Sequence, residues 1–222
     1  MSRSAASPMA RALALYAREA LGVRLHVRAR HWLCPLERIA AYVPPQGRVL
    51  DVGCGHGLFS NLLALESPAR QVLGVDPMAS KIAVAARVAR GLTNVCYRVG
   101  TAADVTDGDY DVITILDVLY LLPRPEKLAL LERCRALLRP GGLLLLKTND
   151  TAPRWKYLWT RFQEQVMVGL GLTLGQGLYF LSAAENAALL AAAGFQSQTV
   201  RLDSWLPYPH VLFVARPVGQ AR

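Results

Sequence analysis

Short apolar runs alternate along the chain with segments in which apolar residues recur at helical spacing. The runs of strand length are residues 49–52, 71–75, 95–99, 110–117 and 143–146. Between them, residues 58–65 and the later positions Leu128, Leu131 and Leu138 show the spacing of one face of a helix. The middle of the chain is therefore predicted to alternate strands with helices.

The N-terminal part is predicted to be helical. Residues 9–21 form an amphipathic pattern whose apolar stripe is Met9, Leu13, Tyr16 and Ala20. Such a helix packs on the domain, which we favour, or lies on a membrane surface. Pro35 opens a second short helix over 36–42, which Pro44 and Pro45 close.

The C-terminal part begins with a helix start signal. Ser182 and Glu185 form a capping box, which opens a helix that ends at Gly194. Two β-rich runs follow, over residues 196–202 and 211–215. The chain is thus predicted to end in a pair of strands.

Three alternate glycines follow the first apolar run, at Gly53, Gly55 and Gly57, and Asp51 stands just ahead of them. Glycine has no Cβ, so the loop can adopt left-handed angles and let a ligand lie against the backbone at the start of the next helix. A dinucleotide fingerprint would need its last glycine where this chain has Leu58. The pattern favours a bound ligand other than NAD over a tight turn without a ligand.

With Asp51 in place, this run resembles motif I of the class I S-adenosylmethionine-dependent methyltransferases, in which an acid precedes Gly-x-Gly-x-Gly. The resemblance covers about residues 47–216, and the Leu-x-Pro-Gly-Gly turn at 138–142 supports it. It implies an α/β, Rossmann-like fold with a mostly parallel seven-stranded sheet, helices on both faces and a C-terminal antiparallel hairpin. It also implies that Asp51 and the three glycines lie at the methionine part of S-adenosylmethionine.

Two further strand ends are expected to contact the cofactor. Asp76 ends the second strand, where an acid accepts hydrogen bonds from ribose hydroxyls in nucleotide-binding α/β folds; an N-cap role is the structural alternative. Pro77 follows it at the expected start of a helix that runs to about Gly91. In the family an acid after the third strand binds the adenine amino group, and this chain has Thr101 there, followed by Ala102. A hydroxyl or a backbone carbonyl can accept the same hydrogen.

The end of the fourth strand supplies the candidate catalytic group. Asp117, Val118 and Tyr120 are predicted to line the site, because ligands of open α/β sheets bind outside the carboxyl ends of the strands. Asp117 could orient a hydroxyl or amine nucleophile or accept its proton, and it could equally contact the cofactor or cap the next turn. His31 is a weaker candidate base, with a surface position as the alternative.

Aromatic and basic residues gather between Lys147 and Gly177. In this family an insertion at this place forms a substrate-facing lid, so Trp155 and Tyr157 are predicted to face the substrate, Tyr157 also being a weak catalytic candidate. An amphipathic helix docked on the core explains the same residues equally well. We expect one domain, 1–222, with a helical N-terminal cap (1–46), a cofactor-binding core (47–150), a lid-like insertion (151–180) and a last helix with hairpin (181–222).

Net charge, cysteine content and the length of the apolar runs limit which binding partners and cellular location we expect. The 222 residues carry a net charge of +9, and residues 1–48 hold eight arginines against two glutamates. This segment could attract phosphates, an anionic membrane surface or an acidic substrate, or it could be a solvated face. The four separated cysteines indicate neither a metal site nor disulfides. No run is long enough to span a membrane, which predicts a cytoplasmic protein with peripheral membrane contact through the basic N-terminal helix as an option.

The function predicted from these features is methyl transfer from S-adenosylmethionine to an O, N or C nucleophile of a small or lipid-like metabolite. A sulfonium is a good leaving group, so the protein mainly aligns the reactants and excludes water, and no fixed catalytic signature is required. Nucleic acid is not favoured, since the charge excess is modest outside residues 1–48. The alternatives are an RNA or carrier-bound substrate and a non-catalytic cofactor-binding domain that engages a partner.

Overall fold

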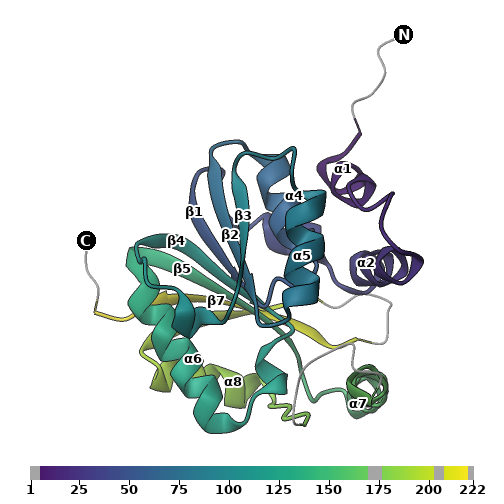
Figure 1. Ribbon diagram of the computed structural model, residues 1–222. Coiled ribbons are helices and arrows are strands. Elements are labelled where there is room, and N and C mark those ends of the chain that lie inside the picture. The colour runs from purple at the N-terminus through teal and green to yellow at the C-terminus, as the bar shows by residue number, and fades with distance from the viewer. Residues whose placement is uncertain (1–5, 170–176, 203–207, 220–222) are drawn as a thin grey trace. The chain divides into compact units, whose positions relative to one another are not determined.

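The structure is a computed structural model that describes residues 6–169, 177–202 and 208–219. Its strands form a seven-stranded mixed sheet in the order β3-β2-β1-β4-β5-β7-β6, which confirms the predicted fold class (Figure 1). The chain divides into two compact units, one up to Gly100 and one from Thr101 onward.

The first unit contains three parallel strands. Strand β1 (Gly47–Val52) pairs in parallel with β2 (Arg70–Asp76), which pairs in parallel with β3 (Val95–Val99). Helix α4 (Leu58–Glu66) connects β1 to β2, and α5 (Ala79–Val88) connects β2 to β3. Residues Leu58 to Ala64 of α4 are all buried, including the polar Ser60 and Asn61, whose side chains are hydrogen-bonded. The predicted β3 has the observed bounds, and the other predicted strands and helices here differ from the observed ones by one to three residues at their ends.

The N-terminal region differs from the prediction. The helix expected over 9–21 ends early: α1 spans Pro8–Ala14, a turn follows, and α2 spans Leu21–Leu33. The turn places Tyr16 so that its Oη donates to the carbonyl oxygen of His56 at 2.7 Å. Met9 and Tyr16 are buried, so the stripe packs on the protein, which was the favoured interpretation. The second expected helix is observed as α3 (Leu36–Ala40).

The second unit contains the other four strands. Strand β4 (Tyr110–Leu116) pairs in parallel with β5 (Leu138–Asn149), β5 pairs antiparallel with β7 (His210–Pro217), and β7 pairs antiparallel with β6 (Phe195–Arg201). This confirms the C-terminal antiparallel hairpin.

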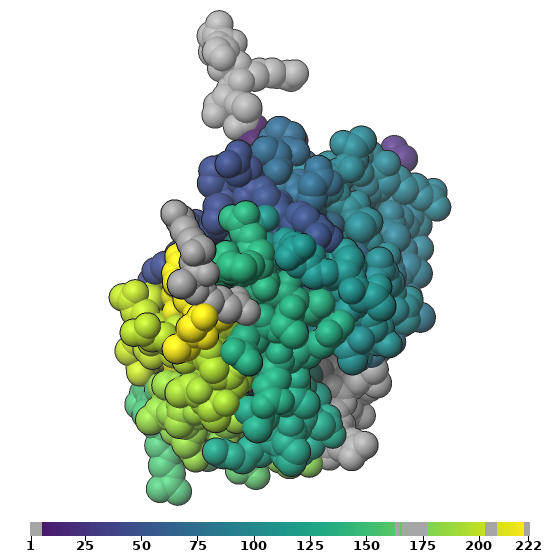
Figure 2. All heavy atoms as spheres, turned by 90° about the vertical axis from the view of Figure 1, so that its left-hand side faces the viewer, coloured from purple at the N-terminus to yellow at the C-terminus, as the bar shows by residue number. Residues whose placement is uncertain are grey.

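Helices complete the second unit. Helix α6 (Arg124–Leu137) and helix α8 (Ala183–Ala192) contact each other and lie side by side on the face seen in Figure 2. The capping box predicted at Ser182 and Glu185 is present at the start of α8. Helix α7 (Arg154–Gly169) follows β5, and the short 3-10 turns η1 (Ala102–Asp104) and η2 (Leu119–Leu121) flank β4.

The turn predicted at 139–142 lies inside β5, which is therefore longer than the expected 143–146. The register of β4 against β5 jumps between Tyr110 and Val112, so these residues form an irregularity within the ladder. Gly141 takes φ +75°, and a Cβ on Gly142 would lie 3.0 Å from the carbonyl oxygen of Arg139. The glycines therefore let the strand absorb its extra residues.

Candidate functional site

The glycine loop joins the end of β1 to α4 in the expected conformation. Gly53, Gly55 and Gly57 have φ values of 74°, 56° and 83°, all in the left-handed region that favours glycine. A Cβ on Gly57 would lie 2.6 Å from the Oη atom of Tyr97, whereas one on Gly55 would meet nothing within 4 Å. Gly57 is required by packing, and the space beside Gly55 is open to a ligand.

Asp51 supports this loop from beneath. Its side chain is buried, and its Oδ2 accepts a hydrogen bond of 2.6 Å from the Oγ of Ser60 in the first turn of α4. The carboxylate thus ties the end of β1 to the helix that follows the loop. Among the predicted cofactor residues, Asp51 acts here by holding the loop.

Asp76 ends β2, as predicted, and faces the same loop. Its Oδ2 accepts from the backbone N–H of Gly55 at 3.0 Å, and its Oδ1 accepts from that of Met78 at 2.9 Å. A carboxylate has about four lone-pair positions, so each oxygen keeps one for a further donor. Both roles weighed from the sequence are compatible with this geometry: the carboxylate caps the backbone before α5 and can still bind two ribose hydroxyls. Pro77 is exposed beside it.

A chain of hydrogen bonds fixes the loop carbonyls. Asn61 Nδ2 donates to Tyr16 Oη at 3.0 Å, and Tyr97 Oη donates to Asn61 Oδ1 at 2.7 Å. Tyr97 Oη also lies 3.2 Å from the carbonyl oxygen of Gly57. Burial raises the pKa of Tyr16 and of Tyr97 above the ordinary value for tyrosine, so both phenols stay protonated and donate their hydrogen bonds. This network was not predicted from the sequence, because its members come from three separate segments.

Two histidines meet beside the loop. The ring of His26, on α2, lies edge-on to the ring of His56 between Gly55 and Gly57, with centroids 4.9 Å apart. Burial lowers the pKa of each to about 4, and Lys81 on α5 contributes in the same direction. His31, the histidine singled out from the sequence, lies in the last turn of the same helix and is half-buried.

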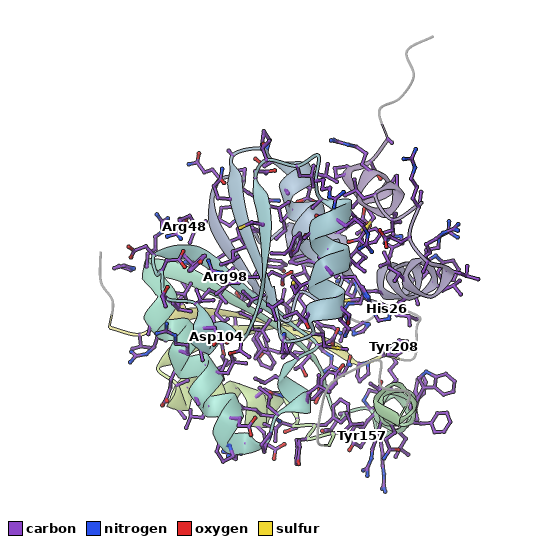
Figure 3. All side chains as sticks on the ribbon, viewed as in Figure 1. His26, Arg48, Arg98, Asp104, Tyr157 and Tyr208 are labelled. Carbon is purple, nitrogen blue, oxygen red and sulfur yellow. The ribbon has the colours of Figure 1, made fainter. Side chains whose placement is uncertain are left out.

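In the second unit, Thr101 and Asp104 bind each other. The backbone N–H and the Oγ1 of Thr101 both donate to Asp104 Oδ2, at 2.8 and 2.9 Å. These hydrogen bonds lower the pKa of Asp104 below its ordinary value. Ala102 is buried in the turn that these hydrogen bonds close. The position of Asp104 is labelled in Figure 3. Asp104, to which the sequence assigned no role, is thus the partner that orders Thr101.

Asp117 follows β4 with φ 61°, an unusual angle for a residue other than glycine. Its Oδ1 lies 2.5 Å from the Nζ of Lys147 on β5, and both side chains are almost fully buried. Val118, the next residue, is half-buried. A carboxylate that balances a buried ammonium is suited to holding a polar group in place, and a strained backbone angle of this kind is common at functional sites.

Aromatic side chains from three segments also cluster in the second unit. The Tyr120 ring stacks on Phe180 at 4.7 Å, and the Tyr157 ring meets Phe180 edge-on at 5.6 Å. The structure thus brings together two of the three residues predicted to face the substrate. The third, Trp155, is exposed on α7, as are Trp159 and Phe162. The segment 147–177 is helical over α7, and part of the expected lid, residues 170–176, lies outside the described residues.

Near the end of β5, two further polar pairs went unnoticed in the sequence. Asn149 Oδ1 and His210 Nδ1 lie 2.9 Å apart and are buried. Asp150 Oδ2 accepts from Arg201 at 3.1 Å. Their members are far apart in the chain, so no local motif could reveal them. Within 6–169, 177–202 and 208–219, no group of three metal-ligating side chains occurs, and no helix has the length and apolarity of a membrane span.

Comparisons with known proteins bear on the identity of this site. A family model described as a methyltransferase domain matches residues 24–200. A ubiquinone biosynthesis O-methyltransferase from Xanthomonas axonopodis pv. citri is 33% identical over 169 residues, which cover 74% of this chain and 70% of the relative.

Solved structures show the same fold. Magnesium protoporphyrin IX methyltransferase from Synechocystis PCC 6803, with bound S-adenosylhomocysteine, aligns with a TM-score of 0.66 at 22% identity over 91% of each chain. Mitomycin 7-O-methyltransferase aligns with a TM-score of 0.70 at 20% identity, over 93% of this chain and 60% of its own length.

Proposed function

The chain belongs to the class I S-adenosylmethionine-dependent methyltransferases, and we propose that it transfers the cofactor's methyl group to a hydroxyl oxygen of a small molecule. The observation that carries this proposal is the glycine loop with Asp76 hydrogen-bonded to Gly55, which leaves carboxylate lone pairs for ribose hydroxyls and open space beside Gly55 for the rest of the cofactor. The choice of oxygen rests on the relatives, which are named O-methyltransferases.

The cofactor supplies an activated methyl group, and the residues of this chain bind and orient it. We assign Gly53, Gly55 and Gly57 to the methionine portion and Asp76, with Pro77 beside it, to the ribose. Thr101 and Ala102 are assigned to the adenine. Thr101 Oγ1 donates to Asp104 and accepts from the backbone N–H of Ala103, and the Thr101 carbonyl oxygen accepts from the backbone N–H of Asp104. We assign the second lone pair of this carbonyl oxygen to the adenine amino hydrogen.

Substrate-side roles are assigned to the second unit. Asp117 is paired with Lys147, which favours orienting a polar group over accepting a proton. Val118 lines this strand end beside it. Tyr120 and Tyr157, joined through Phe180, offer aromatic surface for a flat ring, and we retain exposed Trp155 as a third substrate-facing residue.

Calorimetric titration with S-adenosylhomocysteine tests the cofactor assignment. Wild-type protein is expected to bind, and Asp76→Ala to lose at least about tenfold in affinity, because charge-assisted hydrogen bonds to ribose disappear. Since Asp76 also holds two backbone N–H groups, Asp76→Asn is measured beside it. Glu126→Gln, an exposed change on α6, is the matched control and should bind like wild type. Folded wild-type protein that fails to bind would overturn the proposal.

Transfer of labelled methyl groups distinguishes the acceptor classes. We expect incorporation into small hydroxyl compounds and none into RNA or carrier protein. Labelling of RNA or of a carrier protein alone would replace the small-molecule assignment. Cofactor binding without transfer to any component of a metabolite extract would instead support a non-catalytic, cofactor-binding domain.

We also propose peripheral membrane contact through the N-terminal region, with α2 in place of the helix expected over 9–21. Leu21, Leu25 and Trp32 are exposed by 65%, 56% and 72%, and exposed Arg28 lies on the same side of the helix. Exposed apolar residues beside arginine suit an anionic lipid surface. Wild-type protein should sediment with phosphatidylglycerol vesicles, and the α2 double variant Leu25→Ser/Trp32→Ser should sediment with them less. Equal sedimentation of Trp155→Ser and the α2 variant would contradict it.

A further inference from the structure

A groove lies between α1, α2 and the turn that joins them, and all three belong to the first unit. The two helices and the turn can be followed in Figure 1. The groove has a volume of about 350 Å³, which is at the lower end of the range of small-molecule sites. None of the residues that line it is among those assigned above to the cofactor or to the substrate, so it is a candidate for a separate binding site.

One wall of the groove is apolar. Ala10, Leu13 and Ala14 of α1 line it, together with Ala17 of the following turn. The three alanines are exposed and Leu13 is half-buried, so their methyl groups are open to an occupant. Val27, on the α2 side, is buried. An apolar ligand in the groove would shield this surface from water, which is favourable because apolar surface is poorly hydrated.

The charged part of the lining comes from α2. Arg24 and Arg28 are four residues apart, so they lie on the same face of that helix. Among the residues that the structure describes, neither guanidinium takes part in an ion pair or a hydrogen bond. A guanidinium presents several N–H donors in a planar fork that matches the two oxygens of a carboxylate. The groove therefore combines an apolar wall with two cations that can bind an anionic group.

The surroundings of the groove are also positively charged. Glu19 is the only acidic residue between positions 6 and 33 of the sequence. Its carboxylate is paired with Arg87, whose Nη2 lies 2.6 Å from Glu19 Oε2. It therefore leaves the charge of Arg24 and Arg28 uncompensated, and the complementary ligand is an amphiphile with a negative head group.

We propose that this groove binds a single-chain carboxylate, such as a free fatty acid anion, with the chain along α1 and the carboxylate between Arg24 and Arg28. At about 30 Å³ for each methylene-sized group, the volume of one water molecule, the groove holds a chain of about ten carbons. This is enough for one chain and too little for the two chains of a phospholipid. The proposal goes beyond the methyl transfer and does not depend on it.

The test is calorimetric titration of the full chain with octanoate and decanoate, both below the concentrations at which they form micelles. Affinity should rise about tenfold from octanoate to decanoate, because two more methylene groups leave water. Arg24→Gln/Arg28→Gln should weaken decanoate binding about tenfold, since charge-assisted hydrogen bonds are lost. Arg11→Gln/Arg18→Gln, which removes the same charge from exposed positions outside the groove, is the matched control and should bind like wild type.

A second variant tests the apolar wall with both arginines in place. Ala14→Leu fills part of the groove and should also weaken decanoate binding about tenfold, because the chain loses its contact surface. Ala29→Leu, at an exposed position of α2 that does not line the groove, should have no effect. Circular dichroism establishes that each variant is folded before it is titrated.

Several results would overturn the proposal. Folded wild-type protein that does not bind decanoate would do so, as would decanoate binding that neither groove variant weakens. Equal affinity for decyltrimethylammonium and decanoate would show that the arginines do not select an anion. Equal binding of sulfate and decanoate would show that the chain contributes nothing. Binding to phosphatidylglycerol vesicles that Ala14→Leu abolishes, without binding of free decanoate, would assign the groove to a bilayer lipid instead.

Discussion

At the scale of single residues, the glycine loop shows two different reasons for one residue type. Gly55 and Gly57 both have positive φ, so any other residue at either position bears backbone strain. Only Gly57 is also enclosed: an added Cβ there would meet the Tyr97 phenol and would lie 2.9 Å from the methyl group of Ala85. The two positions therefore separate strain from steric exclusion within a single loop.

Gly57→Ala is expected to destabilise the protein more than Gly55→Ala. Strain alone costs about 1–2 kcal/mol, and forcing Tyr97 and α5 aside at Gly57 adds about 1–3 kcal/mol. The free energy of unfolding in urea measures both. Gly91→Ala, where the added methyl meets nothing within 4 Å and φ is not positive, is the control. Equal losses at Gly55 and Gly57 would show that Tyr97 moves away freely.

The histidine pair predicts a loss of stability in mild acid. The pKa of His26 and of His56 is about 4 in the folded protein against 6.5 ordinarily, so between these values the unfolded chain binds more protons. Stability therefore falls as pH decreases from 6.5 to 4, by about 2 kcal/mol for the pair after allowance for their partial exposure. Urea unfolding at pH 7 and at about pH 4.5 measures it. The double variant His26→Gln/His56→Gln should lose this component, whereas His31→Gln should keep it.

At the scale of elements, apolar periodicity predicted those segments in which apolar residues recur at the regular spacing of a strand or a helix. Strand β3 was predicted with its observed bounds, and the capping box located the start of α8. Helix α2 was missed because Leu21, Val23, Leu25 and Val27 alternate with other residues, which is the period of a strand, and only Val27 is buried. The helix expected over 9–21 was predicted too long because its stripe continues to Ala20, while the contact of Tyr16 with the loop requires a turn.

Arg70 joins several elements of the first unit, so its replacement should affect stability strongly. Its guanidinium donates to the carbonyl oxygens of Pro44 and Val43, each at 2.8 Å, and to that of Leu63 at 3.1 Å. A lysine ammonium cannot reproduce this planar fork, so Arg70→Lys should cost about 2–3 kcal/mol. Urea unfolding measures the cost. Exposed Arg90→Lys should stay within about 0.5 kcal/mol of wild type, and a similar small effect at Arg70 would contradict the structural role.

Asp117 and Lys147 link the ends of β4 and β5 by an almost fully buried ion pair. Asp117→Asn should lower the free energy of unfolding by about 3 kcal/mol, because the buried ammonium loses its counter-charge. Asp117→Asn/Lys147→Met should recover much of this loss, since no unpaired charge remains. Both are measured in urea. A double variant as unstable as the single one would indicate that Asp117 acts through contacts other than Lys147.

At the scale of the whole molecule, the family and its cofactor followed from one motif and the order of the strands, whereas the arrangement of polar groups did not. Asp76 was recognised because its place at a strand end is a local property. The contact of His26 with His56 joins residues from two separate elements and depends on how α2 packs, which no periodicity encodes. The sequence therefore directed attention to His31, on the same helix, and left its neighbour unnoticed.

Binding of the cofactor product should stabilise the entire chain by mass action. S-adenosylhomocysteine at about 100 times its Kd adds about 2.7 kcal/mol, and for a chain of 222 residues this raises Tm by about 5–10 °C. The net charge of +9 also makes the protein responsive to anions in general, so sodium sulfate must be compared. Asp76→Ala, with an affinity at least about tenfold weaker, should lose about half or more of the shift caused by S-adenosylhomocysteine at the same concentration while keeping its response to sulfate. If Asp76→Ala responds to S-adenosylhomocysteine as wild type does, the Tm increase does not come from the ribose contact, and the assignment of Asp76 fails.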